Sequence, residues 1–265
     1  MKTIILKTIS NAKVNLALDI LGVSKSGKFK GYHKIQTVFA EINSQNTPKF
    51  VPDEITIKAT PSKKISITIS ASRHQQEISA QDSPIHKAAL IMLKEAKAKF
   101  SVEIIVEKNI PISGGLGGGS GNVAAVINGL NMILKLGMSA ERRRRIAAKI
   151  SMDAPFFIEG GLALGENFGE KITNIPPVKG LAFAIFPAEG RLEKTKIEFS
   201  KMTRGIIEKC GRNVEKTIQL VHALKTNESL NIHELVHNDF ELLLKKTLKK
   251  NIHLSGAGPS TFVVV

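Results

Sequence analysis

A run of glycines between a strand pattern and a helix pattern constrains this chain more than any other feature. Residues 111–121 hold six glycines. Alternating apolar residues precede the run at Val102, Ile104 and Val106, and apolar residues at helical spacing follow it from Val123 to Leu134. Glycines let the backbone approach a ligand closely, and the first N–H groups of a helix attract negative charge. The run therefore predicts an anion site, and a nucleoside triphosphate fits that description.

Two common phosphate-binding loops do not match this run. No Gly-Lys-Ser/Thr sequence follows, as a Walker A loop requires, and the glycines are contiguous rather than spaced as in a dinucleotide fingerprint. The plain alternative is a flexible surface connection. Six glycines directly before a helix would be an entropically costly way to build one, so the phosphate interpretation is favoured.

Composition bounds the class of protein. The 265 residues allow one large domain or two ordinary ones, and shares of 42% hydrophobic and 23% charged residues are typical of soluble globular proteins. The single cysteine, Cys210, cannot form an internal disulfide and has no neighbour at metal-ligand spacing. The apolar run after Lys2 ends at Lys7, too early for a secretory signal. We therefore expect a cytoplasmic protein without a metal site of its own.

The charge balance suggests a polyanionic partner, but the other residues argue against one. The formal net charge is +15, from 38 basic and 23 acidic residues. Arg is scarce, Trp is absent and Tyr occurs once, whereas nucleic-acid binders interleave basic and stacking side chains. We expect a lysine-rich solvated surface and no nucleic-acid partner. The cluster Arg142–Arg145 is expected on the exposed side of a helix whose apolar face holds Ile146, Ala147 and Ile150.

An uncharged stretch from Asn109 to Leu134 has the length of a membrane span. Pro111 and the glycines that follow it break any continuous apolar helix, so no membrane partner is expected.

The remaining pattern mixes strands and helices in both halves, which predicts an α+β chain. The segment Val14 to Leu21 alternates between apolar and other residues, so it predicts a half-buried strand. Gly160 and Gly161 interrupt the pattern, and we expect two lobes, residues 1–160 and 161–265. Further strands are expected around Ile55–Ile57, Ile65–Ile69, Leu181–Phe186 and Thr261–Val265, and helices over Ser83–Ala96, from Ser139 onward, and over Ile206–Leu224 and Ile232–Leu248.

Several segments resemble the motifs of the galactokinase, homoserine, mevalonate and phosphomevalonate (GHMP) kinase superfamily. They are the glycine run, the N-terminal segment Asn11–Leu16 and the C-terminal segment Leu254–Ser260. Three others, Gly31–Phe39, Met152–Phe157 and Asn238–Glu241, are similar to segments of one member. That member phosphorylates the 2-hydroxyl of a cytidyl diphosphate sugar alcohol, in the non-mevalonate route to isoprenoid precursors.

The resemblance implies a fold and a reaction. The fold is a two-lobe α+β fold, with an N-terminal ribosomal-S5-like lobe, a C-terminal α+β lobe, and ATP and substrate in the cleft. Lys13 and Asp153 match the catalytic pair, and Mg²⁺ is implied only as the complex with ATP. The expected nucleotide contacts are Pro111, Ile112, Ser113, Gly114, Gly115, Leu116, Gly117, Gly118, Gly119, Ser120 and Gly121.

Three residues are expected to bind the substrate. Tyr32 and His33 fall in a segment that resembles the cytidine-binding segment, and Asn15 shares a strand face with Lys13. Taken alone, each of these side chains would be read as an ordinary surface or core residue. The matching motif context favours the functional interpretation.

Two departures from the family pattern bear on the site. Gly121 stands where the family commonly has a second Ser, which leaves Ser120 as the hydroxyl near magnesium. The segment 188–193 replaces a Gly-Val-Ser-Thr-Ala run, so the substrate-facing surface of the C-terminal half differs. Two alternatives stay open at this point: a sister kinase for homoserine or mevalonate, and a basic, non-catalytic nucleic-acid-binding module.

Overall fold

The structure is a computed structural model that describes residues 2–71, 83–97, 99–191, 194–226 and 232–265. The chain forms two compact units that interleave along the sequence. The first unit takes residues 1–11, 51–110 and 118–159, and the second takes residues 12–50, 111–117 and 160–265. The chain thus changes unit between Glu159 and Gly160, next to the expected lobe boundary. The division into lobes 1–160 and 161–265 itself stays a prediction.

The first unit is built on a four-stranded sheet. Alternation along its strands turns Ile55 and Ile57, and likewise Ile104 and Val106, into the core. Neighbouring strands are antiparallel except for the last pair, which is parallel. The sheet order is β1 (Ile4–Ser10), β4 (Asp53–Pro61), β6 (Phe100–Glu107) and β5 (Ser66–Ala71).

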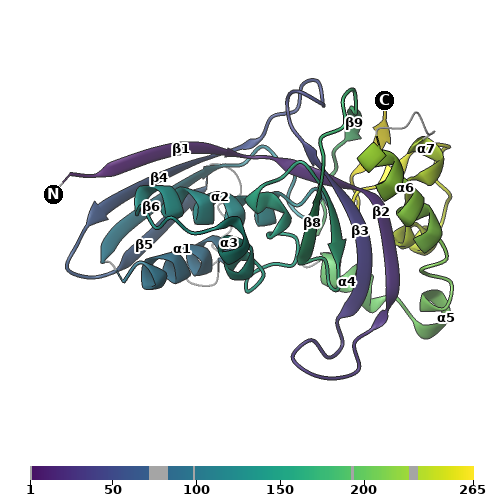
Figure 1. Cartoon of the computed structure of the whole chain (residues 1–265), viewed down its shortest axis with the longest axis horizontal. Coiled ribbons are helices and arrows are strands. Elements are labelled where there is room, and N and C mark those ends of the chain that lie inside the picture. The colour runs from purple at the N-terminus through teal and green to yellow at the C-terminus, as the bar shows by residue number, and fades with distance from the viewer. Residues whose placement is uncertain (1, 72–82, 98, 192–193, 227–231) are drawn as a thin grey trace. The chain divides into compact units, whose positions relative to one another are not determined.

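Helices cover the apolar face of this sheet (Figure 1). α1 (Pro84–Glu95) begins after Ser83 with a proline in its first turn, as the sequence predicts. α2 (Gly118–Ile133) follows the glycine run and is buried over most of its length. α3 (Ala140–Ala147) begins after Ser139, whose hydroxyl accepts a hydrogen bond from the backbone N–H of Arg142. A short 3₁₀ helix, η1 (Phe156–Ile158), completes the unit.

Three of the four arginines of α3 join this helix to other parts of the first unit, and the fourth forms an ion pair within the helix. Arg142 pairs with Glu95 of α1 at 2.6 Å, and Arg143 donates to the side-chain oxygen of Asn128 in α2. The other two form ion pairs within the unit, Arg144 with Glu159 and Arg145 with Glu141. These contacts give the basic cluster a structural role. The expectation that the cluster lies on the exposed side of the helix is wrong for Arg143 and Arg144, which are partly buried because they bond to Asn128 and Glu159.

The second unit contains a five-stranded sheet and a three-stranded sheet. In the larger one, the long strands β2 and β3 form its antiparallel centre, and β10 joins β2 in parallel. The orders are β10 (His237–Asn238), β2 (Ala12–Val23), β3 (His33–Ile42), β7 (Leu162–Glu166), β8 (Lys171–Ile175), and β11 (His253–Leu254), β12 (Thr261–Val264), β9 (Phe183–Phe186).

The prediction that the segment from Val14 is a half-buried strand is wrong. Residues 12–20 of β2 are buried on both faces. The apolar face packs into the core, while the polar face is covered by the chain's own polar groups. Asp19, for example, accepts hydrogen bonds from Thr217 and lies 3.0 Å from the ring of His237. Alternation therefore marks a fully buried strand here, because long-range contacts satisfy its polar residues.

Two long helices expected near the C-terminus are also wrong. The range Ile206–Leu224 is divided into α5 (Arg204–Ile207) and α6 (Val214–Thr226), and the range Ile232–Leu248 contains only α7 (Ile232–Leu235), followed by β10 and the 3₁₀ helix η2 (Asp239–Leu243). The helix α4 (Lys194–Ser200) was not expected. Residues 192–193 lie outside the described ranges, so the divergent segment 188–193 is described only up to Arg191.

Buried polar side chains explain these interruptions. The carboxylate of Asp239 accepts the backbone N–H groups of Ile20 at 2.7 Å and Gly211 at 2.8 Å, and Gly211 has a positive φ of 67°. The side chain of Asn238 accepts from the N–H of Phe240 and donates to two carbonyls of the C-terminal glycine segment. Tertiary hydrogen bonds thus replace the helical ones that local periodicity predicts.

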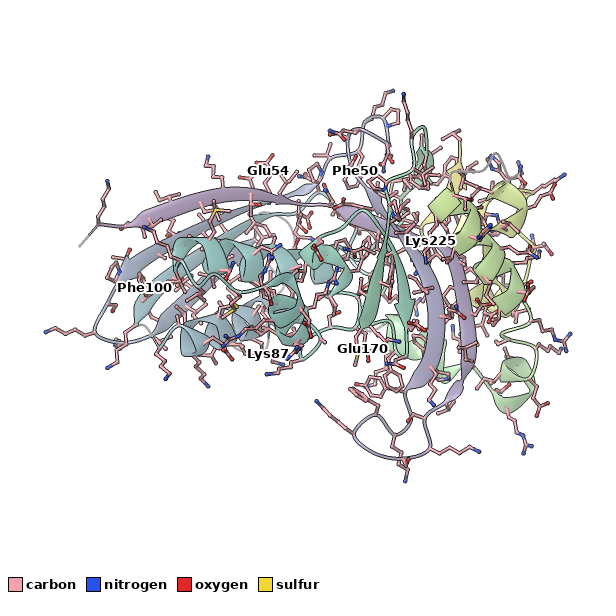
Figure 2. All side chains as sticks on the ribbon, viewed as in Figure 1. Phe50, Glu54, Lys87, Phe100, Glu170 and Lys225 are labelled. Atoms are coloured by element: carbon pink, nitrogen blue, oxygen red, sulfur yellow. The ribbon has the colours of Figure 1, made fainter. Side chains whose placement is uncertain are left out.

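Within the described ranges, no helix has both the length and the apolar composition needed to cross a membrane. Lys87 on α1, in the first unit, and Lys225 on α6, in the second, are both exposed (Figure 2). The structure thus agrees with a lysine-rich solvated surface.

Candidate active site

Lys13 of β2 is a buried cation fixed by two oxygen acceptors. Only 2% of the residue is exposed. Its ammonium donates to the side-chain oxygen of Asn15 and to the carbonyl of Gly115, both at 2.7 Å, and lies 6.0 Å from the centre of the Phe39 ring. A buried lysine is costly unless it is hydrogen-bonded, and these contacts supply the bonds. Asn15 lies on the same strand face as Lys13, as expected, and the hydrogen bond between them was not predicted.

Thr37 of β3 determines which way the Asn15 amide points. The hydroxyl of Thr37 donates to the carbonyl of Ala17 at 2.6 Å, so it is left to accept from the Asn15 amide nitrogen at 2.8 Å. The Asn15 oxygen is thereby turned towards Lys13, and it also accepts the N–H of Gly256 at 3.0 Å. Thr37 was not among the predicted site residues, although it lies in the segment Gly31–Phe39.

The glycine run and the C-terminal glycine segment meet through their backbones in the second unit. A β-carbon at Gly115 would lie 2.0 Å from the carbonyl oxygen of Ser255, and one at Gly256 would lie 3.0 Å from the Lys13 nitrogen. Both glycines have positive φ, 86° and 53°. The Ser255 hydroxyl donates to the Gly115 carbonyl at 2.9 Å. Glycine is therefore required at these positions for backbone contact around Lys13.

The run changes unit at the point where its helix begins: residues 111–117 belong to the second unit and α2 to the first. The first N–H groups of α2 have no acceptor inside the helix, which makes this end suited to an anion. The glycines here differ in their surroundings. A β-carbon at Gly118 would lie 2.9 Å from the Ile110 side chain, whereas one at Gly119 would meet no atom within 4 Å. Of these two glycines, Gly119 is the one that faces open space.

Gly121 departs from the family's second Ser for a packing reason. A β-carbon here would lie 2.5 Å from the hydroxyl of Ser10 and 2.9 Å from the carbonyl oxygen of Asn11. The turn between β1 and β2 therefore fills the space that a side chain at position 121 would need. Ser120 remains as the available hydroxyl of this turn.

Asp153 lies in the first unit, in the turn that leads to η1. Its carbonyl accepts the N–H of Phe156 at 3.2 Å. Nearby in the chain, the Ser151 hydroxyl lies 2.7 Å from the hydroxyl of Ser120 in α2. The beginning of α2 and the Asp153 turn are thus joined side chain to side chain. Lys13 belongs to the other unit, so the pairing of Lys13 with Asp153 stays a prediction.

Tyr32 and His33 stand at the start of β3. Tyr32 is 50% exposed, whereas the ring of His33 stacks on Phe199 of α4, with centroids 4.9 Å apart and planes at 30°. Burial lowers the pKa of His33, so the ring is neutral near pH 7. Its Nε2 atom is buried without a hydrogen-bond partner among the residues described. Phe199 was not predicted, because it follows the divergent segment 188–193 and has no motif signal.

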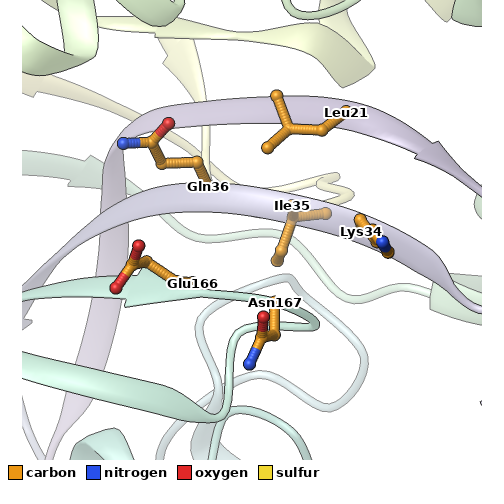
Figure 3. Close-up of a pocket in the computed structure, with 6 residues that line it drawn as sticks. All are labelled: Leu21, Lys34, Ile35, Gln36, Glu166 and Asn167. Atoms are coloured by element: carbon orange, nitrogen blue, oxygen red, sulfur yellow. The ribbon is translucent and has the colours of Figure 1, made fainter.

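Two cavities lie in the second unit, and neither is lined by a predicted site residue. One, of about 170 Å³, is lined by side chains of β2, β3 and β7, among them Leu21, Gln36 and Glu166 (Figure 3). The other, of about 390 Å³, is lined in part by Ala257 and Pro259 of the C-terminal glycine segment. The described residues contain no group of three or more His, Cys, Asp or Glu side chains able to hold a metal.

Known proteins match both the sequence and the fold. Residues 83–161 match the family "GHMP kinases N terminal domain". The 4-diphosphocytidyl-2-C-methyl-D-erythritol kinase of Clostridioides difficile is 31% identical, covering 96% of this chain and 84% of that relative. The kinase of the same name from Gloeobacter violaceus is 27% identical, covering 99% of this chain and 85% of the relative.

Solved structures share the fold. A crystal structure of 4-(cytidine 5'-diphospho)-2C-methyl-D-erythritol kinase matches with a TM-score of 0.67 at 22% identity, covering 98% of this chain and 90% of that one. Mevalonate pyrophosphate decarboxylase from Streptococcus pyogenes matches with a TM-score of 0.70 at 12% identity, covering 100% of this chain and 90% of that one. These likenesses give the fold, which is the expected α+β fold of GHMP kinases.

The curated relatives, together with the matched domain, define an ATP-dependent small-molecule kinase of the GHMP type. Within that class the chain belongs to the family of 4-diphosphocytidyl-2-C-methyl-D-erythritol kinases, as the Clostridioides difficile relative, 31% identical over nearly the whole chain, demonstrates. Both steps confirm the resemblance drawn from the motifs. The non-catalytic alternative is not favoured.

Proposed function

We propose that this chain transfers the γ-phosphate of ATP to the 2-hydroxyl of 4-diphosphocytidyl-2-C-methyl-D-erythritol. The observation that carries the proposal is the buried ammonium of Lys13, held at 2.7 Å by both Asn15 and Gly115. A lysine positioned by the phosphate loop itself supports transfer chemistry rather than a surface role. The substrate follows from the names of the relatives that cover nearly the whole chain.

ATP is held by the glycine run, residues 111–121, in this proposal. The first turn of α2 supplies free N–H groups, and the open space at Gly119 supports a phosphate beside that turn. Phosphoryl transfer depends mainly on positioning and charge stabilisation rather than on covalent help from the protein. In this proposal the backbone N–H groups of the glycine run position the phosphates, and the fixed ammonium of Lys13 stabilises their charge.

Magnesium enters only with the nucleotide. The described residues offer no carboxylate cage for a resident ion, and Mg²⁺ bound to ATP is usually held by phosphates, water and one or two protein oxygens. The Ser120 hydroxyl, already fixed by Ser151, fits as one such oxygen. When bound, the ion neutralises charge that develops on the phosphates.

Lys13 and Asp153 act as the catalytic pair. Asp153 orients the substrate hydroxyl and accepts its proton late in the transfer, and Lys13 offsets negative charge on the transferred group. Asn15 contacts the substrate next to Lys13. The turn that carries Asp153 is tied to α2 through Ser151 and Ser120, which supports a fixed position for this turn relative to the beginning of α2.

The cytosine base is recognised by Tyr32 and His33. Tyr32 offers an exposed aromatic face, and stacking of a base on such a face contributes about 1–3 kcal/mol. A neutral His33 keeps one donor and one acceptor nitrogen, which is what the polar edge of cytosine requires. Phe199, stacked on His33, joins this proposed site.

The test is an ATP-consumption assay with four acceptor conditions: the cytidyl substrate, mevalonate, homoserine and none. We expect turnover with the cytidyl substrate alone, and Tyr32→Ala should raise its KM while leaving the KM for ATP unchanged. Turnover with mevalonate or homoserine instead would assign a sister kinase. A substrate analogue whose cytosine is replaced by a group that cannot stack should be a poor substrate, and equal use of it would remove Tyr32 and His33 from base recognition.

Location and partners follow from the same proposal. A free thiol at Cys210 suits the reducing cytoplasm. We propose no nucleic-acid partner, which is checked by binding to RNA and DNA at two salt concentrations. Steeply salt-dependent binding that ignores ATP would contradict this part of the proposal.

A further inference from the structure

Tyr32 belongs to a cluster of three aromatic rings contributed by two separate loops of the second unit. Phe29 and Tyr32 lie in the connection between β2 and β3, and Phe168 lies in the turn between β7 and β8. The ring centroids of Phe29 and Tyr32 are 5.6 Å apart, those of Tyr32 and Phe168 are 6.0 Å apart, and those of Phe29 and Phe168 are 4.7 Å apart. Tyr32 meets both phenylalanines edge to face, at 68° and 79°.

The backbone fixes the first loop from which two of these rings project. Ser24 and Tyr32 are joined by a hydrogen bond from the Ser24 N–H to the Tyr32 carbonyl at 2.8 Å, and Gly31 donates to the Ser24 carbonyl at 2.9 Å. The N–H of Tyr32 donates to the carbonyl of Phe29 at 3.0 Å. Gly31 has a φ of 87°, which only glycine adopts readily. The loop is therefore a defined turn that holds Phe29 against Tyr32.

The second loop is fastened to the strand that begins just after Tyr32. The carbonyl of Asn167 accepts the N–H of Ile35 in β3 at 2.7 Å, and Figure 3 shows Asn167 beside Ile35. The N–H of Phe168 donates to the carboxylate of Glu170 at 2.9 Å. Phe168 is thus carried to Tyr32 by a turn anchored on the same strand.

A tyrosine held in this way is prepared for stacking. Two rings restrict its rotation, while 50% of the residue stays exposed. A free surface tyrosine has to be ordered when a ligand binds, and that ordering weakens binding. A ring that is already ordered avoids the loss.

We propose that Phe168 and Phe29 are positioning residues that hold the Tyr32 ring ready for the base of the substrate. This inference rests on the proposed function, because it assumes that Tyr32 stacks on cytosine. Edge-to-face contacts supply the restraint, and Phe168 matters most because it comes from a different part of the chain. No covalent step is involved.

The chain offers a direct probe of this ring. Tyr32 is the only tyrosine and tryptophan is absent, so intrinsic fluorescence excited at tyrosine wavelengths reports on Tyr32 alone. In Phe168→Ala, we expect the fluorescence anisotropy to fall. Affinity for cytidine diphosphate, measured by titration calorimetry, should fall about threefold to tenfold, and the KM for the cytidyl substrate should rise by the same factor. The turnover number and the KM for ATP should stay at wild-type values.

The matched control is Phe186→Ala, which removes an exposed phenylalanine from the same unit, outside the cluster. It should change neither anisotropy nor affinity. Phe168→Leu keeps apolar volume without a ring, and thermal melting establishes that each variant is folded. If Phe168→Ala unfolds, the same measurements on Phe168→Leu test the proposal. We expect both the anisotropy and the affinity for cytidine diphosphate to fall, by less than the alanine variant predicts.

Two outcomes separate this inference from the proposed function. Unchanged anisotropy or unchanged cytidine diphosphate affinity in the folded Phe168 variant overturns the inference, provided that Tyr32→Ala still weakens binding. Wild-type affinity in Tyr32→Ala overturns the base-recognition part of the proposed function, and the positioning role falls with it.

Discussion

The ammonium of Lys13 donates a hydrogen bond to the carbonyl oxygen of Gly115 at 2.7 Å, although the two residues are 102 positions apart in the sequence. This contact ties the N-terminal strand β2 to the glycine run. It explains why a lysine that is only 2% exposed is tolerated. The same cation that we propose for catalysis also stabilises the loop that we propose for ATP.

Replacing Lys13 should therefore affect turnover and stability together. Lys13→Met removes the charge and leaves the oxygens of Asn15 and Gly115 without this donor. We expect turnover to fall by about two orders of magnitude or more and the free energy of unfolding to fall by about 1–3 kcal/mol. Steady-state kinetics and urea denaturation check the two effects. Lys7→Met, on the exposed face of β1, is the control, and equal kinetics in both variants would remove Lys13 from catalysis.

Thr37 should matter through Asn15. Thr37→Val keeps the shape but removes the hydroxyl, so the Asn15 amide loses the partner that turns its oxygen towards Lys13. Turnover should fall about tenfold, with little change in ATP affinity. Thr37→Ser keeps the hydroxyl and should restore most of the activity. If Thr37→Ser lost as much activity as Thr37→Val, the hydroxyl would not be sufficient for the effect, and this would contradict a role through the hydrogen bond alone.

Asp153→Asn keeps size and polarity but removes the carboxylate. We expect ATP binding, measured by calorimetry, to stay near the wild-type value while turnover drops by about two orders of magnitude or more. A variant that binds ATP and retains most of its turnover would take Asp153 out of the catalytic pair.

Gly119 is the glycine that best tests the phosphate site. Alanine there meets open space, and it favours a helix over glycine by about 0.5–1 kcal/mol. Gly119→Ala should therefore raise the free energy of unfolding while ATP affinity falls, since its methyl group enters the region proposed for phosphate. Gly118 is less informative, because a side chain there strikes Ile110 whether or not ATP binds.

The control for Gly119 is another helical glycine in open space, Gly205 of α5. Gly205→Ala should leave ATP affinity unchanged. Unchanged ATP affinity in Gly119→Ala as well would argue against a phosphate at the beginning of α2.

Cys210 should be an unreactive thiol. Burial, with the neighbouring carboxylate of Asp239, raises the pKa of Cys210 to about 12. A raised pKa keeps the protonated form, and only the thiolate reacts with iodoacetamide. At pH 8 the native protein should react roughly 10³-fold more slowly than the chain unfolded in urea. Because the chain has one cysteine, mass spectrometry gives the rate at this site directly, and equal native and unfolded rates would contradict the prediction.

Local signals predicted many of the elements. The helix after Ser83 and the cap at Ser139 carry their own start signals, and both are confirmed. The strands that place Ile55 and Ile104 in the core follow from alternation alone. The glycine run between a strand and a helix was found for the same reason, because turn chemistry and periodicity are properties of neighbouring residues.

The errors have a common cause. Gly211 and Asn238 interrupt helical periodicity because each is bonded to a residue outside its own turn of chain: the N–H of Gly211 donates to the carboxylate of Asp239, and the side-chain amide of Asn238 donates to the carbonyl of Leu254. No window of neighbouring residues contains that information. The same holds for Phe199, whose ring reaches His33 from beyond a divergent segment.

The sequence by itself determined the family, the glycine run that we propose for phosphate and the identity of the candidate residues, because these are carried by residue types at fixed spacing. Only the tertiary structure decided what surrounds them. It brought the Thr37 hydroxyl to the Asn15 amide and packed the backbone of Ser255 against Gly115. It also left open space beside Gly119. These relationships depend on side-chain direction and close packing between distant segments, and both are set only when the chain folds.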